Sequence, residues 1–181
     1  MTDYQIKKLA IKYRNAIESA RDDGSFTLSN SFNHFPCGCC GNASFLLAKY
    51  LLTNGIETIW YSATRDDDDW SHAWLIVKDN RVKEPTPNTF YWHENIRNTI
   101  KKYGINHPEQ GVDLTKYRYK DLEEGLIIDI TGDQFYNYSI PVYVGQMDPF
   151  HKSFDFVQAF KYCTLGDKQL NNLYQIIERY L

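Results

Sequence analysis

Residues 37–44 read Cys-Gly-Cys-Cys-Gly-Asn-Ala-Ser, and they open a stretch whose apolar residues recur at helical spacing. This pattern predicts an amphipathic helix from about Cys40 to Thr53, which the following Asn54-Gly55 pair would end. A thiol in the first turn of a helix lies at the positive end of the helix dipole, which favours the thiolate over the neutral thiol. The run therefore predicts a nucleophilic cysteine at a helix N-terminus.

Two adjacent cysteines compete for the role of nucleophile. Cys40 is favoured because the pattern Gly-x-Cys-x-x-x-Ser places Ser44 one helical turn after it. The backbone N–H of Cys40 would then point at an acyl oxygen and form half of an oxyanion hole, with Asn33 and His34 as candidates for the second donor. Cys39 remains the rival nucleophile and would otherwise be a small packed side chain.

Other readings of the cysteine cluster stay open. Three buried thiols at a tight turn would give the same pattern. A zinc site is disfavoured because structural zinc sites typically use Cys-x(2–4)-Cys pairs, and no second pair is present to complete one from Cys37, Cys39, Cys40, His34 and Cys163. We expect no disulfide framework, no metal and no organic cofactor.

A candidate base lies on a predicted strand at about Trp70 to Lys78. Side chains alternate along a strand, so His72, Trp74 and Ile76 share one face. If this strand packs against the helix that begins at Cys40, His72 reaches the thiol and acts first as base and then as acid. Trp74 is a candidate for contact with the substrate, although a core histidine beside Trp74 is the plainer alternative.

A carboxylate interrupts the apolar run 126–130. An ionised side chain is costly to bury without a partner, so Asp129 is predicted to meet an imidazole N–H and to orient His72. Asp133 is a less favoured substitute, because residues 131–133 have the composition of a turn. The remaining histidines occur in polar or loop contexts and are expected to face solvent: His34, His93, His107 and His151.

The remaining pattern predicts an α+β fold. A first helix is expected from a cap at Thr2-Asp3 to Asp22, a strand at 57–64, a turn at 79–80 that leads into 81–82, strands at 126–130 and 142–144, and a last helix at 166–180. Helices followed by an antiparallel-looking sheet favour α+β over alternating units. An inserted segment at about 84–125 holds prolines, aromatics and two possible short helices near 93–103 and 114–123, and it would form a lid or an added core layer.

Length and composition fit one globular domain over residues 1–181, with 43% hydrophobic residues and a net charge of −3. This charge gives no electrostatic reason to expect a nucleic-acid partner. No run approaches the roughly 18–20 apolar residues of a membrane span, and the polar N-terminus lacks the apolar core of a signal peptide. We therefore expect a cytoplasmic protein without a membrane partner; its oligomeric state stays open.

At these residues the chain resembles the papain-like and transglutaminase-like cysteine enzyme superfamily. Residues 37–44 are similar to the papain-type pattern Cys-Gly-Ser-Cys-Trp-x-x-Ser, with Gly41 at the tryptophan position. The strand with His72, followed by Asp129 and Thr131, looks like the bacterial transglutaminase-like pattern His-Ala-Trp … Asp-x-Thr. Papain's oxyanion glutamine has no counterpart, because His34 stands at that position.

The resemblance implies a papain/transglutaminase-like core, with N-terminal helices packed on a small antiparallel sheet. It implies Cys40 as nucleophile, His72 as base and Asp129 as orienter. The implied activity is that of a cysteine-dependent amide hydrolase or acyl transferase (protease, amidase, deamidase or transglutaminase) acting through a thioester on a protein, a peptide or a small amide. The alternative is a catalytically inactive papain-like fold that serves as a protein-binding module.

Overall fold

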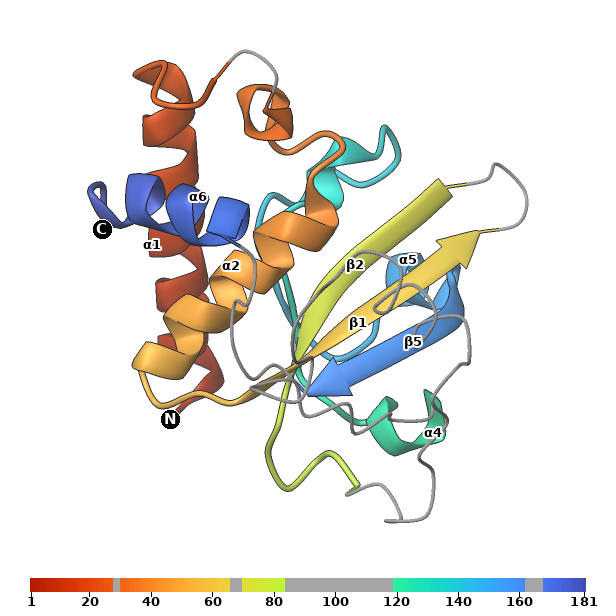
Figure 1. The fold of residues 1–181 in the computed structure, drawn as a ribbon. Coiled ribbons are helices and arrows are strands. Elements are labelled where there is room, and N and C mark those ends of the chain that lie inside the picture. The colour runs from red at the N-terminus through yellow and green to blue at the C-terminus, as the bar shows by residue number, and fades with distance from the viewer. Residues whose placement is uncertain (28–29, 66–69, 84–118, 162–167) are drawn as a thin grey trace, which may run out of the picture.

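The computed structural model describes residues 1–27, 30–65, 70–83, 119–161 and 168–181. Their helices and strands form a mixed α+β fold, as the sequence predicts (Figure 1). The α-helices are α1 (Asp3–Asp22), α2 (Cys40–Thr53), α4 (Tyr119–Leu122), α5 (Pro149–Lys152) and α6 (Lys168–Glu178), with short 3₁₀ helices η1 (Ser31–His34) and η2 (Gly132–Gln134). The strands are β1 (Thr58–Arg65), β2 (Trp70–Val77), β3 (Ile127–Asp129), β4 (Tyr143–Gly145) and β5 (Asp155–Lys161).

The five strands form one antiparallel sheet in the order β4-β3-β2-β1-β5. Strands β1 and β2 pair along their whole length, from Thr58 opposite Val77 to Arg65 opposite Trp70. Strand β3 pairs with β2 only at Leu75 and Ile76. Within the described residues, the first half of β2 is therefore paired on one side only, and the other side is open to a helix.

Two hydrophobic clusters lie on the two faces of the sheet. Helices α1, α2 and α6 cover the face that carries Leu75 and Val77 (Figure 1). Trp74 and Ile76 belong to the second cluster, which includes aromatic residues of the segments around η2 and α5. The predicted alternation along β2 is thus confirmed, and His72 lies on the side of Trp74, with 5.4 Å between ring centroids.

The first helix begins and ends where the sequence predicts. Thr2 forms a capping box with Gln5, whose backbone N–H donates to the Thr2 hydroxyl at 3.2 Å while its side chain accepts from the Thr2 backbone at 2.8 Å. The buried stripe of α1 packs on α2, where the rings of Tyr13 and Tyr50 stack at 5.1 Å.

A buried arginine ties α1 to the segment that follows Asp129. The Arg14 side chain, only 6% exposed, donates to both carboxylate oxygens of Asp133, at 2.7 Å each. It also donates to the carbonyl oxygens of Ile130 at 2.8 Å and of Pro141 at 2.6 Å. Asp133 is therefore the partner of Arg14, and the position of the Asp129 segment depends on the first helix.

Several elements differ from the prediction or fall outside the described residues. The turn at 79–80 is present, but residues 81–82 are not a strand, and β5 was not predicted. The last helix is Lys168–Glu178, which ends two residues before the predicted 180; the predicted first residues, 166–167, lie outside the described part. Residues 84–118 of the inserted segment, which include the predicted helix near 93–103, lie outside the described residues. Helix α4 matches the end of the predicted helix at 114–123, and its Leu122 is buried in the second cluster. Cys163, His93 and His107 also lie outside the described part. No helix in that part combines the length and the hydropathy needed to cross a membrane.

Candidate active site

Cys40 is the first residue of α2, so its backbone N–H has no acceptor within the helix. Gly38 has a left-handed backbone with φ of +68°, which glycine adopts without strain. Cys39 precedes the helix as its N-cap residue. The chain thus turns sharply before the helix, and the turn presents the Cys40 side chain at the positive end of α2.

The open side of β2 receives this end of the helix. The Ser44 hydroxyl donates to the carbonyl oxygen of Ala73 at 3.0 Å, and the backbone of Ala73 also makes a hydrogen bond to the Cys40 sulfur. Cys40 and Ser44 lie one turn apart, so α2 is fixed to β2 through both backbone polar groups of Ala73, the residue next to His72. Most of α2 packs on the face of the sheet that carries Leu75 and Val77, opposite to the side of His72. Its first turn contacts the histidine at the open edge of β2.

His72 connects the thiol to Asp129. Its Nε2 lies 2.8 Å from Oδ2 of Asp129, and both side chains are fully buried. A further hydrogen bond joins its ring to the Cys40 sulfur. The other oxygen of Asp129, Oδ1, accepts from the backbone N–H of Thr131 at 2.9 Å and from its hydroxyl at 3.2 Å. The structure thus brings the three predicted residues together in the order Cys40, His72, Asp129.

The charges of Cys40, His72 and Asp129 stabilise one another. Burial alone would raise the pKa of Cys40, but hydrogen bonding and attraction to His72 lower it below its ordinary 9.0. Burial alone would lower the pKa of His72, but the Asp129 carboxylate beside it raises that pKa to about 9. Burial likewise opposes the charge of Asp129, but the neighbouring imidazoles of His72 and His151 hold its pKa well below the ordinary range. These interactions favour the form of the group that holds a thiolate, an imidazolium and a carboxylate.

The three neighbouring cysteines have different environments. Cys37 is exposed and Cys40 is half-buried, so the reading as three buried thiols is wrong. Cys39 is buried, and its thiol donates to the carbonyl oxygen of Pro36 at 3.3 Å. Burial and the neighbouring thiols raise the pKa of Cys39 to about 12, so it stays protonated where Cys40 ionises. Of the two rivals, Cys40 alone has the properties of a nucleophile.

The expectation that His151 faces solvent is wrong. His151 is only 1% exposed, and its Nε2 lies 3.3 Å from Oδ2 of Asp129. Its Nδ1 lies 2.7 Å from Oδ1 of Asp148, the N-cap residue of α5. The run Asp148-Pro149 is a recognisable helix start, which could have indicated an ordered segment, but no local pattern shows that its histidine turns inward. His34, by contrast, is exposed as expected.

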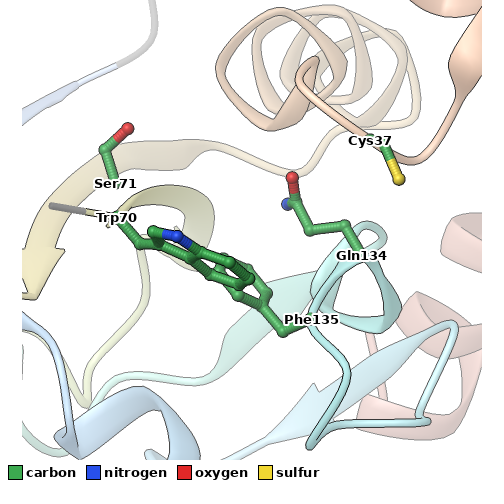
Figure 2. A pocket seen from close by; sticks show the side chains of 5 residues that line it. All are labelled: Cys37, Trp70, Ser71, Gln134 and Phe135. Carbon is green, nitrogen blue, oxygen red and sulfur yellow. The ribbon is translucent and has the colours of Figure 1, made fainter. Parts of the chain in front are cut away.

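A hollow of about 300 Å³ adjoins the site and is lined by Cys37, Trp70, Ser71, Gln134 and Phe135. In Figure 2 the Gln134 side chain extends between the Cys37 loop and the overlapping rings of Trp70 and Phe135, whose centroids are 4.9 Å apart. The Nε2 of Gln134 donates to the carbonyl oxygen of Thr131 at 3.0 Å and lies 3.3 Å from Nδ1 of His72. Its Oε1 accepts from the N–H of Gly38 at 3.3 Å. Sequence reasoning missed Gln134, which comes from η2 rather than from upstream of the thiol.

The predicted oxyanion and substrate residues lie elsewhere. The side-chain amide of Asn33 donates to the carbonyl oxygen of Thr27. Trp74 is fully buried beneath His72, so its indole packs in the core instead of lining the hollow. No group of three or more His, Cys, Asp or Glu residues in the described part of the chain is arranged to hold a metal ion.

The arrangement contains groups suited to nucleophilic chemistry. A thiolate, a proton donor beside it and a helix N–H free of intrahelical bonding are the groups that attack on a carbonyl requires. Comparisons of the chain with protein-family models, with curated proteins and with solved structures gave no match.

Proposed function

We propose that the protein is a cysteine-dependent amide hydrolase or acyl transferase with Cys40 as its nucleophile, His72 as acid and base, and Asp129 as orienter. The observation that carries the proposal is the hydrogen-bonded order of these three side chains, together with the lowered pKa of the Cys40 thiol. The fold is consistent with a papain/transglutaminase-like core, because α2 presents the thiol at its N-terminus and packs on an antiparallel sheet that bears His72 and Asp129.

The reaction follows from the charges at the site. The Cys40 thiolate attacks the carbonyl carbon of an amide, and a carbon–sulfur bond forms as the carbonyl oxygen takes up negative charge. The carbon–nitrogen bond then breaks, and the His72 imidazolium gives its Nδ1 proton to the leaving amine. Water or an amine attacks the resulting thioester while His72 removes its proton, which releases the acyl product and restores the thiolate–imidazolium pair.

Two N–H groups are placed to bind the oxygen that becomes charged. The first is the backbone N–H of Cys40, which has no helical acceptor. The second is the side-chain amide of Gln134, of which one hydrogen is donated to Thr131. Nδ1 of an imidazolium carries a proton and cannot accept the other hydrogen, so this hydrogen remains available to a substrate oxygen. We assign to Gln134 the role that the sequence suggested for Asn33 or His34.

The hollow that includes Gln134 and Ser71, the residue before His72, is the candidate for the acyl side of the substrate. At about 300 Å³ it has room for one side chain or a small acyl group, near the lower end of typical ligand pockets. Trp70 and Phe135 supply aromatic surface, while Ser71 and Gln134 supply polar groups. An acyl donor with a planar or apolar group next to the reacting carbonyl suits this surface best.

The thiol itself provides the first test. Iodoacetamide labelling followed by peptide mass spectrometry should modify Cys40 at pH 6 faster than the same thiol in urea, since a lowered pKa gives a larger fraction of thiolate. Cys39→Ala is the matched control and should keep this reactivity, whereas His72→Ala should remove it. A native Cys40 that reacts no faster than the unfolded thiol would refute the proposal.

The second test asks for acyl transfer. A panel of acyl and peptidyl 4-nitroanilides is incubated with the protein, and the intact mass is followed for an adduct that Cys40→Ala abolishes. Gln134→Ala should slow acylation by about a hundredfold or more, the usual effect of losing one oxyanion donor. Alkylation by iodoacetamide forms no oxyanion, so it should persist in this variant. A reactive Cys40 that no donor acylates would instead favour a binding module.

A further inference from the structure

We propose that His151, held by Asp148, is a positioning residue for Asp129 and forms a second imidazole–carboxylate pair directly behind the first. This inference rests on the proposed function, because it assigns to His151 the support of the His72–Cys40 pair. The geometry points to an alternating series of side chains that runs from the thiol into the protein.

Asp129 lies between two imidazoles that share one of its oxygens. Oδ2 lies 2.8 Å from Nε2 of His72 and 3.3 Å from Nε2 of His151. Oδ1 is bound by the backbone and hydroxyl of Thr131. Without His151, Oδ2 would have His72 as its sole partner among these hydrogen bonds, and the orientation of the carboxylate would be less constrained.

Asp148 fixes the far side of the His151 ring. Its Oδ1 lies 2.7 Å from Nδ1 of His151 and also accepts the backbone N–H of His151 at 3.0 Å. Its Oδ2 accepts the Tyr138 hydroxyl at 2.9 Å. Burial and the neighbouring Asp148 raise the pKa of Tyr138, so this hydroxyl stays protonated and donates. Each oxygen of Asp148 therefore has a donor, and the carboxylate cannot turn without losing one.

Aromatic packing prevents the His151 ring from leaving this position. Its centroid lies 5.0 Å from those of Trp74 and Tyr143, and 5.7 Å from that of Tyr138. The ring of Phe150 lies 5.2 Å away. The titratable groups that contact the His151 ring are thus Asp129, Asp148, Tyr138 and Tyr143, and both ring nitrogens face a carboxylate oxygen.

The expected role follows from these contacts. A donor at Oδ2 stabilises the Asp129 charge in a buried setting and keeps the carboxylate aimed at His72. If that donor is lost, the carboxylate rotates more freely and its average attraction for the His72 imidazolium falls. The thiolate–imidazolium pair then weakens, and a larger fraction of Cys40 is protonated at pH 6.

The test is the pH dependence of Cys40 alkylation by iodoacetamide in three variants. His151→Phe keeps a ring but removes both hydrogen bonds, so alkylation at pH 6 should fall by up to about tenfold, the factor for one pKa unit, and should match the wild type above about pH 9. His151→Gln places an N–H near the position of Nε2 and should retain most of the wild-type profile. Asp148→Asn keeps the size of the side chain and should shift the profile in the same direction as His151→Phe, by less.

A stability control separates positioning from simple loss of packing. Leu173→Ala, in α6 on the other face of the sheet, also loses a buried side chain but should leave the alkylation profile unmoved. If wild-type Cys40 is fast and His151→Phe leaves its profile in place or shifts it to lower pH, the inference fails and the proposed function stands. If wild-type Cys40 reacts no faster than an unfolded thiol, both fail.

Discussion

The hydroxyl of Ser44 donates a 3.0 Å hydrogen bond to the carbonyl oxygen of Ala73, in the strand residue next to His72. One turn earlier on the same helix, the Cys40 sulfur receives a hydrogen bond from the Ala73 backbone. A single residue of β2 therefore helps to set both the distance and the rotation of the thiol-bearing helix relative to the histidine. The placement of the reactive pair depends on this docking as much as on the pair itself.

Removing the Ser44 hydroxyl should loosen this docking. Ser44→Ala leaves a buried carbonyl oxygen without its donor, so the free energy of unfolding should fall by about 1–2 kcal/mol, and Cys40 alkylation at pH 6 should slow. Urea denaturation and iodoacetamide labelling measure the two effects. Ser25→Ala removes another serine hydroxyl, which lies 2.7 Å from that of Tyr180, far from the thiol, and should leave labelling unaltered. Equal labelling rates in the two variants would show that the docking bond does not govern reactivity.

The pH dependence of the unfolding free energy should reflect the shifted pKa values of His72 and Cys40. The His72 pKa rises from 6.5 to about 9, so its contribution is complete below pH 6.5 and is lost as pH rises through about 9. The Cys40 pKa is lowered, so its contribution is complete above 9.0 and is lost as pH falls through the folded pKa. Wherever Cys40 is ionised between pH 6.5 and about 9, the folded protein holds one proton on His72 and the unfolded chain holds one on Cys40, so these two residues should give no net slope of stability with pH.

Cys40→Ala should expose the contribution of His72 to the pH dependence of stability. Without the thiol, the native state holds one proton more than the unfolded chain above pH 6.5, so stability should fall with pH by up to about 1.4 kcal/mol per unit. Chemical denaturation at pH 6.5, 7.5 and 8.5 gives the slope, and Cys39→Ala, which removes a neutral thiol, serves as the matched control. A flat profile in Cys40→Ala would mean that His72 is neutral in the folded protein.

Arg14 should be essential for stability although it lies far from the thiol in sequence. Arg14→Met leaves Asp133 and two carbonyl oxygens without their shared donor, and the unfolding free energy should fall by about 3 kcal/mol or more. Arg21→Met, on the same helix but more exposed, should cost much less. In the double variant Arg14→Met/Asp133→Asn, part of the loss should be recovered, because position 133 then holds no unpaired carboxylate and Glu18 is the one carboxylate that still lacks its bond to Arg14. Strictly additive losses would contradict a specific pairing.

Gly132 should tolerate no side chain. A Cβ at this position would lie 2.8 Å from Oδ2 of Asp129 and 2.8 Å from the ring of Tyr138, both held on the far side by their own partners. Gly132→Ala should therefore displace Asp129 and reduce both stability and Cys40 alkylation. At Gly41 the nearest atom to a Cβ belongs to Trp60, at 3.9 Å, so Gly41→Ala is the matched control and should be mild. Thermal melts and labelling at pH 6 compare the two variants. Equal effects would show that the close approach at Gly132 does not govern stability or reactivity.

Local chemistry explains what the sequence predicted well. The first helix follows from a capping box and an apolar stripe, and the alternation along β2 correctly placed His72 beside Trp74. The apolar run around Asp129 predicted its burial, and the cost of burying a carboxylate alone predicted its imidazole partner. Each of these signals is contained within about ten neighbouring residues.

What the sequence missed depends on contacts between distant segments. The bond between Arg14 and Asp133 spans 119 positions, and the contact between His72 and Gln134 spans 62. His151 occurs in a polar run, and only the folding of an aromatic layer around it turns its ring toward Asp129. Local composition contains no information about which distant partner a polar residue meets, so tertiary packing decides it.

The order of residues along the chain gives the lowered pKa of Cys40 a consequence for protein synthesis. Cys40 leaves the ribosome before His72 and Asp129, the residues on which its ionisation depends. A nascent or incomplete chain therefore exposes an ordinary thiol with a pKa near 9.0. On the proposed function, the thiol gains its reactivity only when the later strands have docked, so we expect unfinished or unfolded copies of the chain to be less reactive toward electrophiles than the folded protein.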